Sequence, residues 1–484
     1  MALSAPERAV FRKLGVFAGG FSGTAAQAVC SGATGPTDVL VHLGRLVDKS
    51  LVVVAYSRGR ESRYRLLEPV RQLALEQLEH DDEPRAVRDR HLHWFLAAAR
   101  EAEKSLESDS RLLDGLEEDQ GNLRQALGWA LASGNALAAL EMAVALPKFW
   151  RVRGSLEEGC NWIERALEKG CAVDQHLRLR ALHWLRALRF YQGDFAEAKR
   201  LAEECLALAT SMKDKSGVAE ALAAVGNLAS RQGDFEQGRA YLEKSVAAWT
   251  EAGSDGAVKS LVDSLMLLGW LWLDQGNLVR ARPLLEQALA RADGADRAMR
   301  VFVRCLLADL ERAEGNLAPA RMLLDESLLI AQDLGFTRYT AYLLTCMGRL
   351  ARSEGHGTEA FLIQADALTM HQQVGNKHGS AWALEELGKA AADAGDFETT
   401  ALLFGAAEAL RDAIGFPLPP AERVDLAVST SMAASALGRE AMAMAWERGR
   451  TAPLGDSVRF AAMACDSYSP GAGPIPSASV DPHE

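Results

Sequence analysis

The chain has 484 residues, more than one hydrophobic core usually organises, since single cores stop growing near roughly 250 to 300 residues. Hydrophobic residues make up 49% and charged residues 24% of the chain, as in folded globular proteins and unlike disordered or collagen-like ones. The formal net charge is −12, no apolar stretch is long enough to span a membrane and the first residues lack a secretory pattern, so we expect a cytoplasmic protein without membrane contact.

Residues 1–80 are predicted to form a winged-helix domain. Three helices are followed by a β-hairpin at 51–67 and by one more helix, which is the winged-helix layout. The predicted helices occupy residues 6–15, 22–31, 36–48 and 69–79. This segment contains ten Lys or Arg and seven Asp or Glu, which leaves a net charge of −15 on residues 81–484. Any contact with DNA phosphates is therefore expected within the first 80 residues.

Six basic side chains of this domain are candidate contacts for DNA or for a protein partner. They lie on the third helix and on the hairpin, at Arg45, Lys49, Arg58, Arg60, Arg63 and Arg65. A DNA-binding winged helix uses this placement for groove and backbone contacts. Leucines of the third helix are committed to the core, however, and Asp48 and Glu61 dilute the charge. We favour a solvated face or a protein contact, with DNA as the less favoured partner.

After connecting helices at 81–140, a short phrase built around a glycine recurs seven times, with Asp or Asn after the glycine in five units, Ser in the first and His in the sixth. Its glycines stand at 154, 193, 233, 276, 315, 355 and 395. A helix-forming stretch such as 218–232 precedes each glycine, and a glycine can end a helix in the left-handed conformation. The following Asp or Asn can cap the next helix. The pattern predicts about seven helical hairpins at 141–450, stacked into a superhelix.

Two further positions indicate close packing inside a hairpin. A small residue stands three positions after the Phe or Leu of the phrase in five units, at Ala198, Gly238, Ala281, Ala320 and Ala360. Four units also place a glycine seven residues before the turn, at Gly226, Gly269, Gly348 and Gly388. A helical glycine costs about 1 kcal/mol relative to alanine, so its repetition predicts a close helix crossing there.

This arrangement resembles the tetratricopeptide repeat, in the long form found in sensor arms of bacterial signalling ATPases. The resemblance implies a right-handed superhelix whose first helices line a groove. It places in that groove Glu220, Asn227, Asp263, Trp270, Arg349, Arg352, Trp382 and Glu385. The expected fold is thus mainly α: a winged helix with a small β-hairpin, then an α-solenoid of tetratricopeptide-like hairpins. The tail at 451–484 is expected to be partly disordered.

The N-terminal sequence resembles a second family. VFAGGF (16–21), LVDKSLV (46–52) and YRLLEPVRQLALEQL (64–78) are similar to the segment after the nucleotide-binding module of bacterial STAND-type predicted ATPases and LuxR-family regulators. In that architecture the winged helix is a packing and relay element. The chain contains no G-x-x-x-x-G-K-[ST] motif and no LuxR-type DNA-binding module near its end. This fits a split or truncated gene, or a wrongly assigned start.

No cofactor, metal or catalytic residue is expected. The seven cysteines are scattered and never form CxxC, and His91 and His93 point to different sides of a helix. No G-x-S-x-G elbow frames a nucleophile.

We therefore expect a non-catalytic regulatory protein, the sensor-arm portion of a STAND-type protein, that binds a protein or small effector in its groove. The partner could be an ATPase module on a separate chain. A stand-alone winged-helix DNA-binding regulator with a ligand-sensing solenoid is the main alternative, and an inert remnant of a longer gene is the other.

Overall fold

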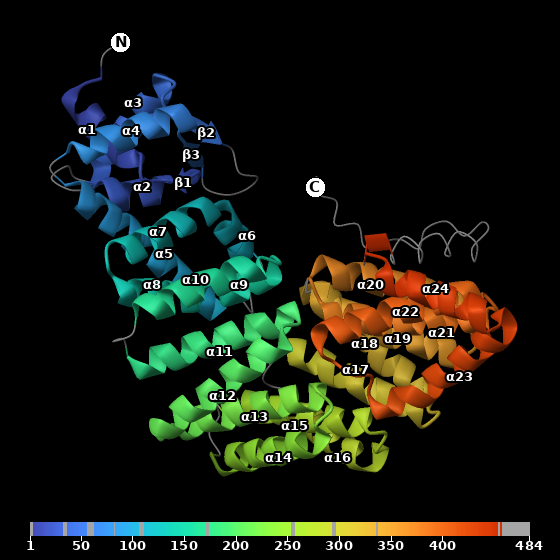
Figure 1. Cartoon of the computed structure of the whole chain (residues 1–484). Helices are drawn as coiled ribbons and strands as arrows, with labels where there is room; N and C mark the ends of the chain where they lie inside the picture. Colours follow the sequence, from blue (N-terminus) through green and yellow to red (C-terminus); the bar gives the residue numbers. More distant parts are fainter. Residues whose placement is uncertain are drawn as a thin grey trace. The chain divides into compact units, whose positions relative to one another are not determined.

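The computed structural model describes most of the chain. The described residues are 3–31, 36–55, 62–81, 83–105, 111–170, 174–252, 257–292, 297–334, 337–453 and 455–456. They form two compact units, Met1–Leu188 and Arg189–Glu484, each considered by itself below (Figure 1). Within the described ranges, no helix is both long enough and apolar enough to cross a lipid bilayer.

The first unit begins with the predicted winged helix. Its helices are α1 (Ala5–Leu14), α2 (Gly23–Cys30), α3 (Pro36–Asp48) and α4 (Glu68–Glu79). Its strands are β1 (Gly20–Ser22), β2 (Val53–Ala55) and β3 (Arg63–Arg65), paired antiparallel in the order β1-β3-β2. The sequence did not predict β1, because three residues between two helices are too few to show an alternating pattern. This strand carries Phe21, whose ring stacks on Phe17 with the ring centroids 4.4 Å apart.

Six helices complete the connection after the winged helix: α5 (Pro84–Ser105), α6 (Arg111–Glu118), α7 (Gln120–Ala132), α8 (Ala136–Ala145), α9 (Pro147–Val152) and α10 (Leu156–Lys169). Asn122 on α7 ties them to the winged helix. Its side-chain oxygen accepts a hydrogen bond from the Ala18 amide at 2.8 Å, and its amide nitrogen donates to the Gly20 carbonyl at 2.7 Å. The winged helix and these helices are therefore joined by buried polar contacts.

The second unit is an array of helical hairpins. The first helices are α11 (Gln175–Gln192), which begins in the first unit, α13 (Lys215–Arg231), α15 (Val258–Asp274), α17 (Arg297–Ala313), α19 (Thr337–Ser353) and α21 (Lys377–Asp393). The second helices are α12 (Phe195–Ser211), α14 (Phe235–Ala252), α16 (Leu278–Ala292), α18 (Leu317–Leu334), α20 (Gly357–Gln373) and α22 (Phe397–Ile414). Two helices follow, α23 (Pro420–Leu437) and α24 (Arg439–Thr451). The mainly helical fold class with a helical solenoid is confirmed.

The geometry of the hairpins confirms the reading of the repeat. All seven turn glycines have positive φ, between 74° and 88°, the left-handed conformation that ends a helix without strain at glycine. The side chain of Asp396 caps α22 by accepting from the Thr399 amide at 3.2 Å. A Cβ atom added to Gly388 would lie 2.4 Å from the Phe404 ring of the second helix, so the predicted close crossing is also confirmed.

The array is strongly curved. Helices α13 and α21 are four hairpins apart, and packed helices lie about 8–10 Å apart, so a straight stack would separate these two by more than about 30 Å. The Phe416 ring nevertheless lies 4.3 Å from the His378 ring of α21 and 5.6 Å from the Arg231 guanidinium of α13. The first helices thus surround a common concave surface. We call this surface the inner face and define it by Arg231, Trp270, Asp309, Arg349 and Lys389.

Candidate functional site

The inner face is crossed by a segment of the chain itself, Gly415–Asp425, here called the crossing segment. Gly415 ends α22 in the left-handed conformation, with a φ of 63°. Phe416 to Pro419 form neither helix nor strand, and α23 begins at Pro420. Because proline cannot continue a helix or donate a backbone hydrogen bond, the run FPLPP at 416–420 forces this break. The break turns the chain away from the repeat pattern and onto the inner face.

Phe416 is the apolar anchor of the crossing segment. Its side chain is buried, and its ring lies 5.8 Å from the ring of Phe195 and 4.3 Å from that of His378. Two guanidinium groups also face this ring, those of Arg411 at 5.3 Å and Arg231 at 5.6 Å. An aromatic ring is favoured here because cations are attracted to the negative face of its π system.

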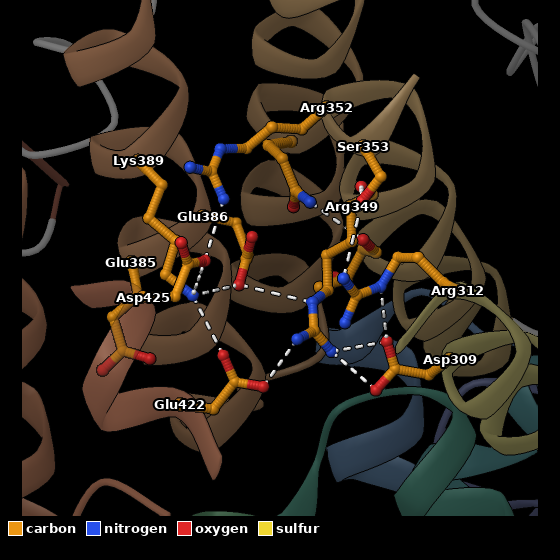
Figure 2. A network of polar contacts seen from close by, with 12 residues as sticks. Asp309, Arg312, Arg349, Arg352, Ser353, Glu385, Glu386, Lys389, Glu422 and Asp425 are labelled. Carbon is orange, nitrogen blue, oxygen red and sulfur yellow. Dashed lines mark hydrogen bonds and ion pairs between the residues drawn. The ribbon is translucent and has the colours of Figure 1, made fainter. Parts of the chain in front are cut away.

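Two carboxylates form the polar anchor. Glu422 lies 2.5 Å from Arg349 on α19 and 2.9 Å from Lys389 on α21 (Figure 2). Asp425, one turn later on α23, lies 2.8 Å from Arg352 and 3.3 Å from Lys389. The first turn of α23 is therefore held by cations from two successive hairpins.

The same cations also meet carboxylates of the array. Arg349 donates to both oxygens of Asp309 on α17 at 2.7 Å, and its Nε atom lies 3.4 Å from Glu386. Lys389 lies 2.8 Å from Glu386, and Arg312 lies 2.9 Å from Asp309. Figure 2 shows that these side chains form one connected network with Glu422 at its edge. Charge-assisted hydrogen bonds of this kind satisfy groups that would otherwise be costly to bury.

Mutual attraction shifts the pKa values of Glu422 and Lys389 in favour of their charged forms. Burial alone would raise the pKa of Glu422, but Arg349 and Lys389 outweigh it and hold that pKa well below its usual range. Burial alone would likewise lower the pKa of Lys389, but the carboxylates of Glu386 and Glu422 raise it above its usual range. The side chain of Lys389 is only 1% exposed, so removing its carboxylate partners would leave a charge without water or counter-ion.

A second charged pair lies beside Phe416. Arg231 lies 3.2 Å from Asp274 on α15, and its guanidinium stacks 3.4 Å above the Trp270 ring. Burial raises the pKa of Asp274 to about 6, and the attraction of Arg231 opposes that rise.

Aromatic rings line the inner face between the two anchors. Trp270 contacts Phe302 with centroids 5.3 Å apart, Phe302 contacts Tyr342 at 5.3 Å, and Tyr342 contacts Trp382 at 6.3 Å. The Arg349 guanidinium also lies over the Trp382 ring, 5.2 Å from the ring centroid. These four aromatic residues come from α15, α17, α19 and α21. The inner face thus combines aromatic rings with buried cations.

Three of the residues predicted to line the groove meet at this site, namely Trp270, Arg349 and Trp382. Arg352 reaches the crossing segment through Asp425. Glu385 is placed differently, because its carboxylate pairs with Arg411 of α22, a second helix.

The other three predicted lining residues lie farther along their helices. Asn227 accepts a hydrogen bond from Arg231 at 3.2 Å. Glu220 lies two helical turns before Asn227, and Asp263 lies two turns before Trp270. The role of the eight residues in ligand binding stays a prediction.

Sequence reasoning missed Arg231, Lys389, Phe416 and Glu422. A signal for Lys389 exists: Glu385, Glu386 and Lys389 place three charges within the otherwise apolar middle of α21. No local pattern could have assigned Glu422 to Arg349, 73 residues earlier in the chain.

Two of the six basic residues predicted for DNA or partner contact are held inside their own unit. Lys49 lies 2.6 Å from Glu7, and this contact lowers the pKa of Glu7 to about 2. Arg63 lies 2.5 Å from Asp119 and also donates to the Gly20 carbonyl at 3.0 Å. Both therefore contribute to the packing of the first unit.

The other four basic residues remain candidates. Arg45 and Arg65 are exposed, while Arg58 and Arg60 lie outside the described residues.

No group of three or more His, Cys, Asp or Glu side chains that could hold a metal ion is found in the part of the chain that the structure describes. Five cysteines are buried and free, as expected of small core residues, and Cys171 and Cys465 lie outside the described ranges.

Comparison with known families supports both regions. Residues 3–79 match the family model described as a winged helix-turn-helix domain, and residues 217–294 match the one described as a tetratricopeptide repeat. The chain therefore carries a winged helix-turn-helix domain and a tetratricopeptide-repeat region.

Similar proteins occur in mycobacteria. The chain is 36% identical over 237 residues to a protein of Mycobacterium tuberculosis named "Putative HTH-type transcriptional regulator", covering 46% of this chain and 26% of that protein. It is 48% identical over 93 residues to an uncharacterized protein of the same organism, covering 18% of this chain and 23% of that protein. The chain thus spans about a quarter of the length of these curated relatives.

Two solved structures share the fold. A signal transduction ATPase with numerous domains (STAND) protein with a tetratricopeptide repeat sensor, from Pyrococcus horikoshii, aligns with a TM-score of 0.52 at 15% identity, over 96% of this chain and 66% of that one. A Rap protein complexed with competence and sporulation factor aligns with a TM-score of 0.51 at 13% identity, over 76% and 99%. At these identities the likeness concerns the fold alone.

Proposed function

We propose that this chain is a non-catalytic regulatory protein whose repeat array receives a segment of a protein partner on its inner face. The observation that carries the proposal is the convergence of buried cations and aromatic rings from α13 to α21 on one concave surface. That surface already holds an irregular stretch of polypeptide, residues 416–419 of the chain itself, and this supports a polypeptide segment as its ligand. A small effector is the other candidate occupant.

Binding there would act through the curvature of the array. Phe416, on the inner face, contacts α13 and α21, which belong to hairpins four apart. If a partner segment replaced the crossing segment, different contacts would hold α13 and α21 together, and their separation could change. A ligand shifts such an equilibrium only through different contacts in the two states. The winged helix would then serve as the relay to a further module, such as a STAND-type ATPase on a separate chain. The domain match and the fold shared with a STAND protein support this assignment.

Transcript profiling in the organism that carries the gene tests this proposal. Trp270→Leu combined with Trp382→Leu removes the two largest rings of the inner face. Trp446→Leu on α24, whose indole donates to Glu408, is the matched control. We expect the double variant to reproduce the transcript changes caused by deleting the gene, at unchanged protein abundance, and the control to resemble the wild type. A deletion without any transcript change would contradict a regulatory role.

A second candidate function is direct DNA binding by the winged helix. The match of residues 3–79 and the exposure of Arg45 and Arg65 favour it. An electrophoretic shift with duplex DNA at low salt, lost in Arg45→Glu combined with Arg65→Glu, would support this function. Absence of any shift at low salt would exclude it.

A further inference from the structure

We propose that the crossing segment is a displaceable internal occupant of the inner face, and that the external partner is an acidic protein segment with an aromatic residue followed, about six residues later, by a carboxylate. The inference rests on the proposed function and specifies its partner. In the chain itself, Phe416 and Glu422 stand at this spacing.

The crossing segment is attached at few points, as expected of an exchangeable occupant. Phe416 is its only residue that is fully buried, and the rest are half-buried or exposed. Its side-chain polar attachment consists of the carboxylates of Glu422 and Asp425, and its Phe416 carbonyl accepts one long hydrogen bond from Arg411 at 3.5 Å. The helices of the array, by contrast, pack along their whole length around buried residues of their own hairpins. Loss of the contacts made by Phe416, Glu422 and Asp425 would release the crossing segment and leave those helix contacts in place.

The charges of the inner face define the chemistry of whatever replaces the segment. Without Glu422 and Asp425, the connected network would hold four cations, Arg312, Arg349, Arg352 and Lys389, against three carboxylates, Asp309, Glu386 and Asp393. With the crossing segment docked, Arg349 and Lys389 are 7% and 1% exposed, so carboxylates rather than water compensate their charges. A replacement must therefore bring carboxylates to the same positions, which an acidic segment does and a neutral or basic one does not.

The apolar anchor defines the second requirement. The Phe416 ring is enclosed by Phe195 and His378 and faces the guanidinium groups of Arg231 and Arg411. An aliphatic side chain could fill part of this space but would forgo the attraction between each guanidinium group and the ring. The site therefore favours an aromatic residue.

Because the crossing segment competes for the inner face, it sets the minimum affinity or concentration at which an external segment can bind there. A tethered segment competes at an effective concentration on the order of 1 mM, and prolines at 417, 419 and 420 reduce the entropy lost on docking. A free segment with the same anchors would thus bind weakly while the crossing segment is docked. A partner must add contacts or be abundant to replace it.

Binding of a labelled synthetic probe that copies residues 412–428 tests the inference, with the full chain and fluorescence anisotropy as the readout. In Phe416→Ala combined with Glu422→Ala, the internal occupant is weakened while its receptors Arg231, Arg349 and Lys389 remain. We expect the probe to bind this double variant at least about 10-fold more tightly than the wild type. Arg423→Ala changes an exposed residue of the same segment and should leave the affinity within about twofold of wild type.

Equal affinity of the wild type and the double variant would overturn the inference, because it would mean that the crossing segment does not compete. A probe with alanine in place of the phenylalanine and the glutamate should not bind the double variant, and binding of that probe would overturn the stated chemistry. If the double variant does not unfold cooperatively, Glu422→Gln alone should still tighten probe binding about threefold or more. Failure of the probe in both variants overturns this inference and leaves the proposed function standing, since transcript profiling does not use the probe.

Discussion

Basic side chains are held in opposite ways in the winged helix and on the inner face of the repeat array. In the winged helix, Lys49 and Arg63 pair with buried or half-buried carboxylates of their own unit. On the inner face, Arg349 and Lys389 are buried, and part of their compensation comes from the crossing segment, outside the repeats.

The difference separates charges that hold a domain together from charges that form a receptor. A pair closed within one domain contributes little to an external field, so Lys49 and Arg63 offer little attraction to a phosphate backbone. A buried cation that depends on a separable segment has affinity for anything that brings the same carboxylates. The predictions below test this contrast, from the largest expected effect to the smallest.

Arg349→Met should be the most damaging of these changes. It leaves Asp309, Glu386 and Glu422 without their shared partner, and breaking a buried ion pair costs about 3 to 5 kcal/mol of unfolding free energy. Arg448→Met, which breaks an exposed pair with Glu398, should cost about 1 kcal/mol or less. Chemical denaturation of both variants measures the difference. Equal losses would show that burial of the network is not what makes it matter.

Glu422→Gln should lower the unfolding free energy by about 2 kcal/mol at pH 7, because a hydrogen-bonded charge is replaced by a neutral amide. The folded state holds the pKa of Glu422 below its ordinary 4.5, so its contribution is present above that pH and is lost as the pH falls. Arg349, Lys389, Glu386 and Asp425 surround it. Denaturation from pH 7 to pH 3 should therefore show the two proteins converging below about pH 4.5. A constant gap would mean that the carboxylate is not paired.

Any binding of the winged helix to duplex DNA should be weak and only moderately salt-dependent. Arg45 and Arg65 are the exposed candidates among the six, when only described residues are considered. Two phosphate contacts predict a loss of about 10-fold in affinity between 50 and 200 mM salt. Anisotropy with labelled duplex at several salt concentrations measures this slope. A loss of about 1,000-fold would indicate six or more contacts and would make this surface a true DNA interface.

The contact between Arg231 and Trp270 should have the smallest effect. Trp270→Leu should lower the unfolding free energy by about 1 kcal/mol, because the guanidinium stacked on the ring loses its partner. A double-mutant cycle with Arg231→Met should give a coupling energy of about 1 kcal/mol. Additive effects would show that the two side chains are merely neighbours.

The sequence predicted what depends on local geometry. A helix that ends at Gly233 needs a positive φ, and a helix crossing at Gly388 needs the absence of a Cβ, so both features leave a glycine at a fixed spacing. The residues that meet on the inner face depend instead on curvature, which accumulates from small rotations at every hairpin. The resemblance to the repeat family predicted Trp270 and Trp382 as groove residues, and both contact other rings of the inner face. It could not reveal that Phe416 docks beside Arg231, which stands 185 residues earlier in the chain. Strand β1 was not predicted, because its three residues are too few to show the alternating pattern of a strand.

Hydrogen–deuterium exchange of the full chain tests the central claim most directly, using an isotope-labelled probe of residues 412–428 so that its fragments differ in mass from those of the chain. On our proposal that the inner face is a receptor for an acidic segment, probe at saturating concentration should make the backbone amides of residues 415–425 exchange at least about tenfold faster while α13 and α21 stay protected. Bound probe with unchanged exchange at 415–425 would contradict the account.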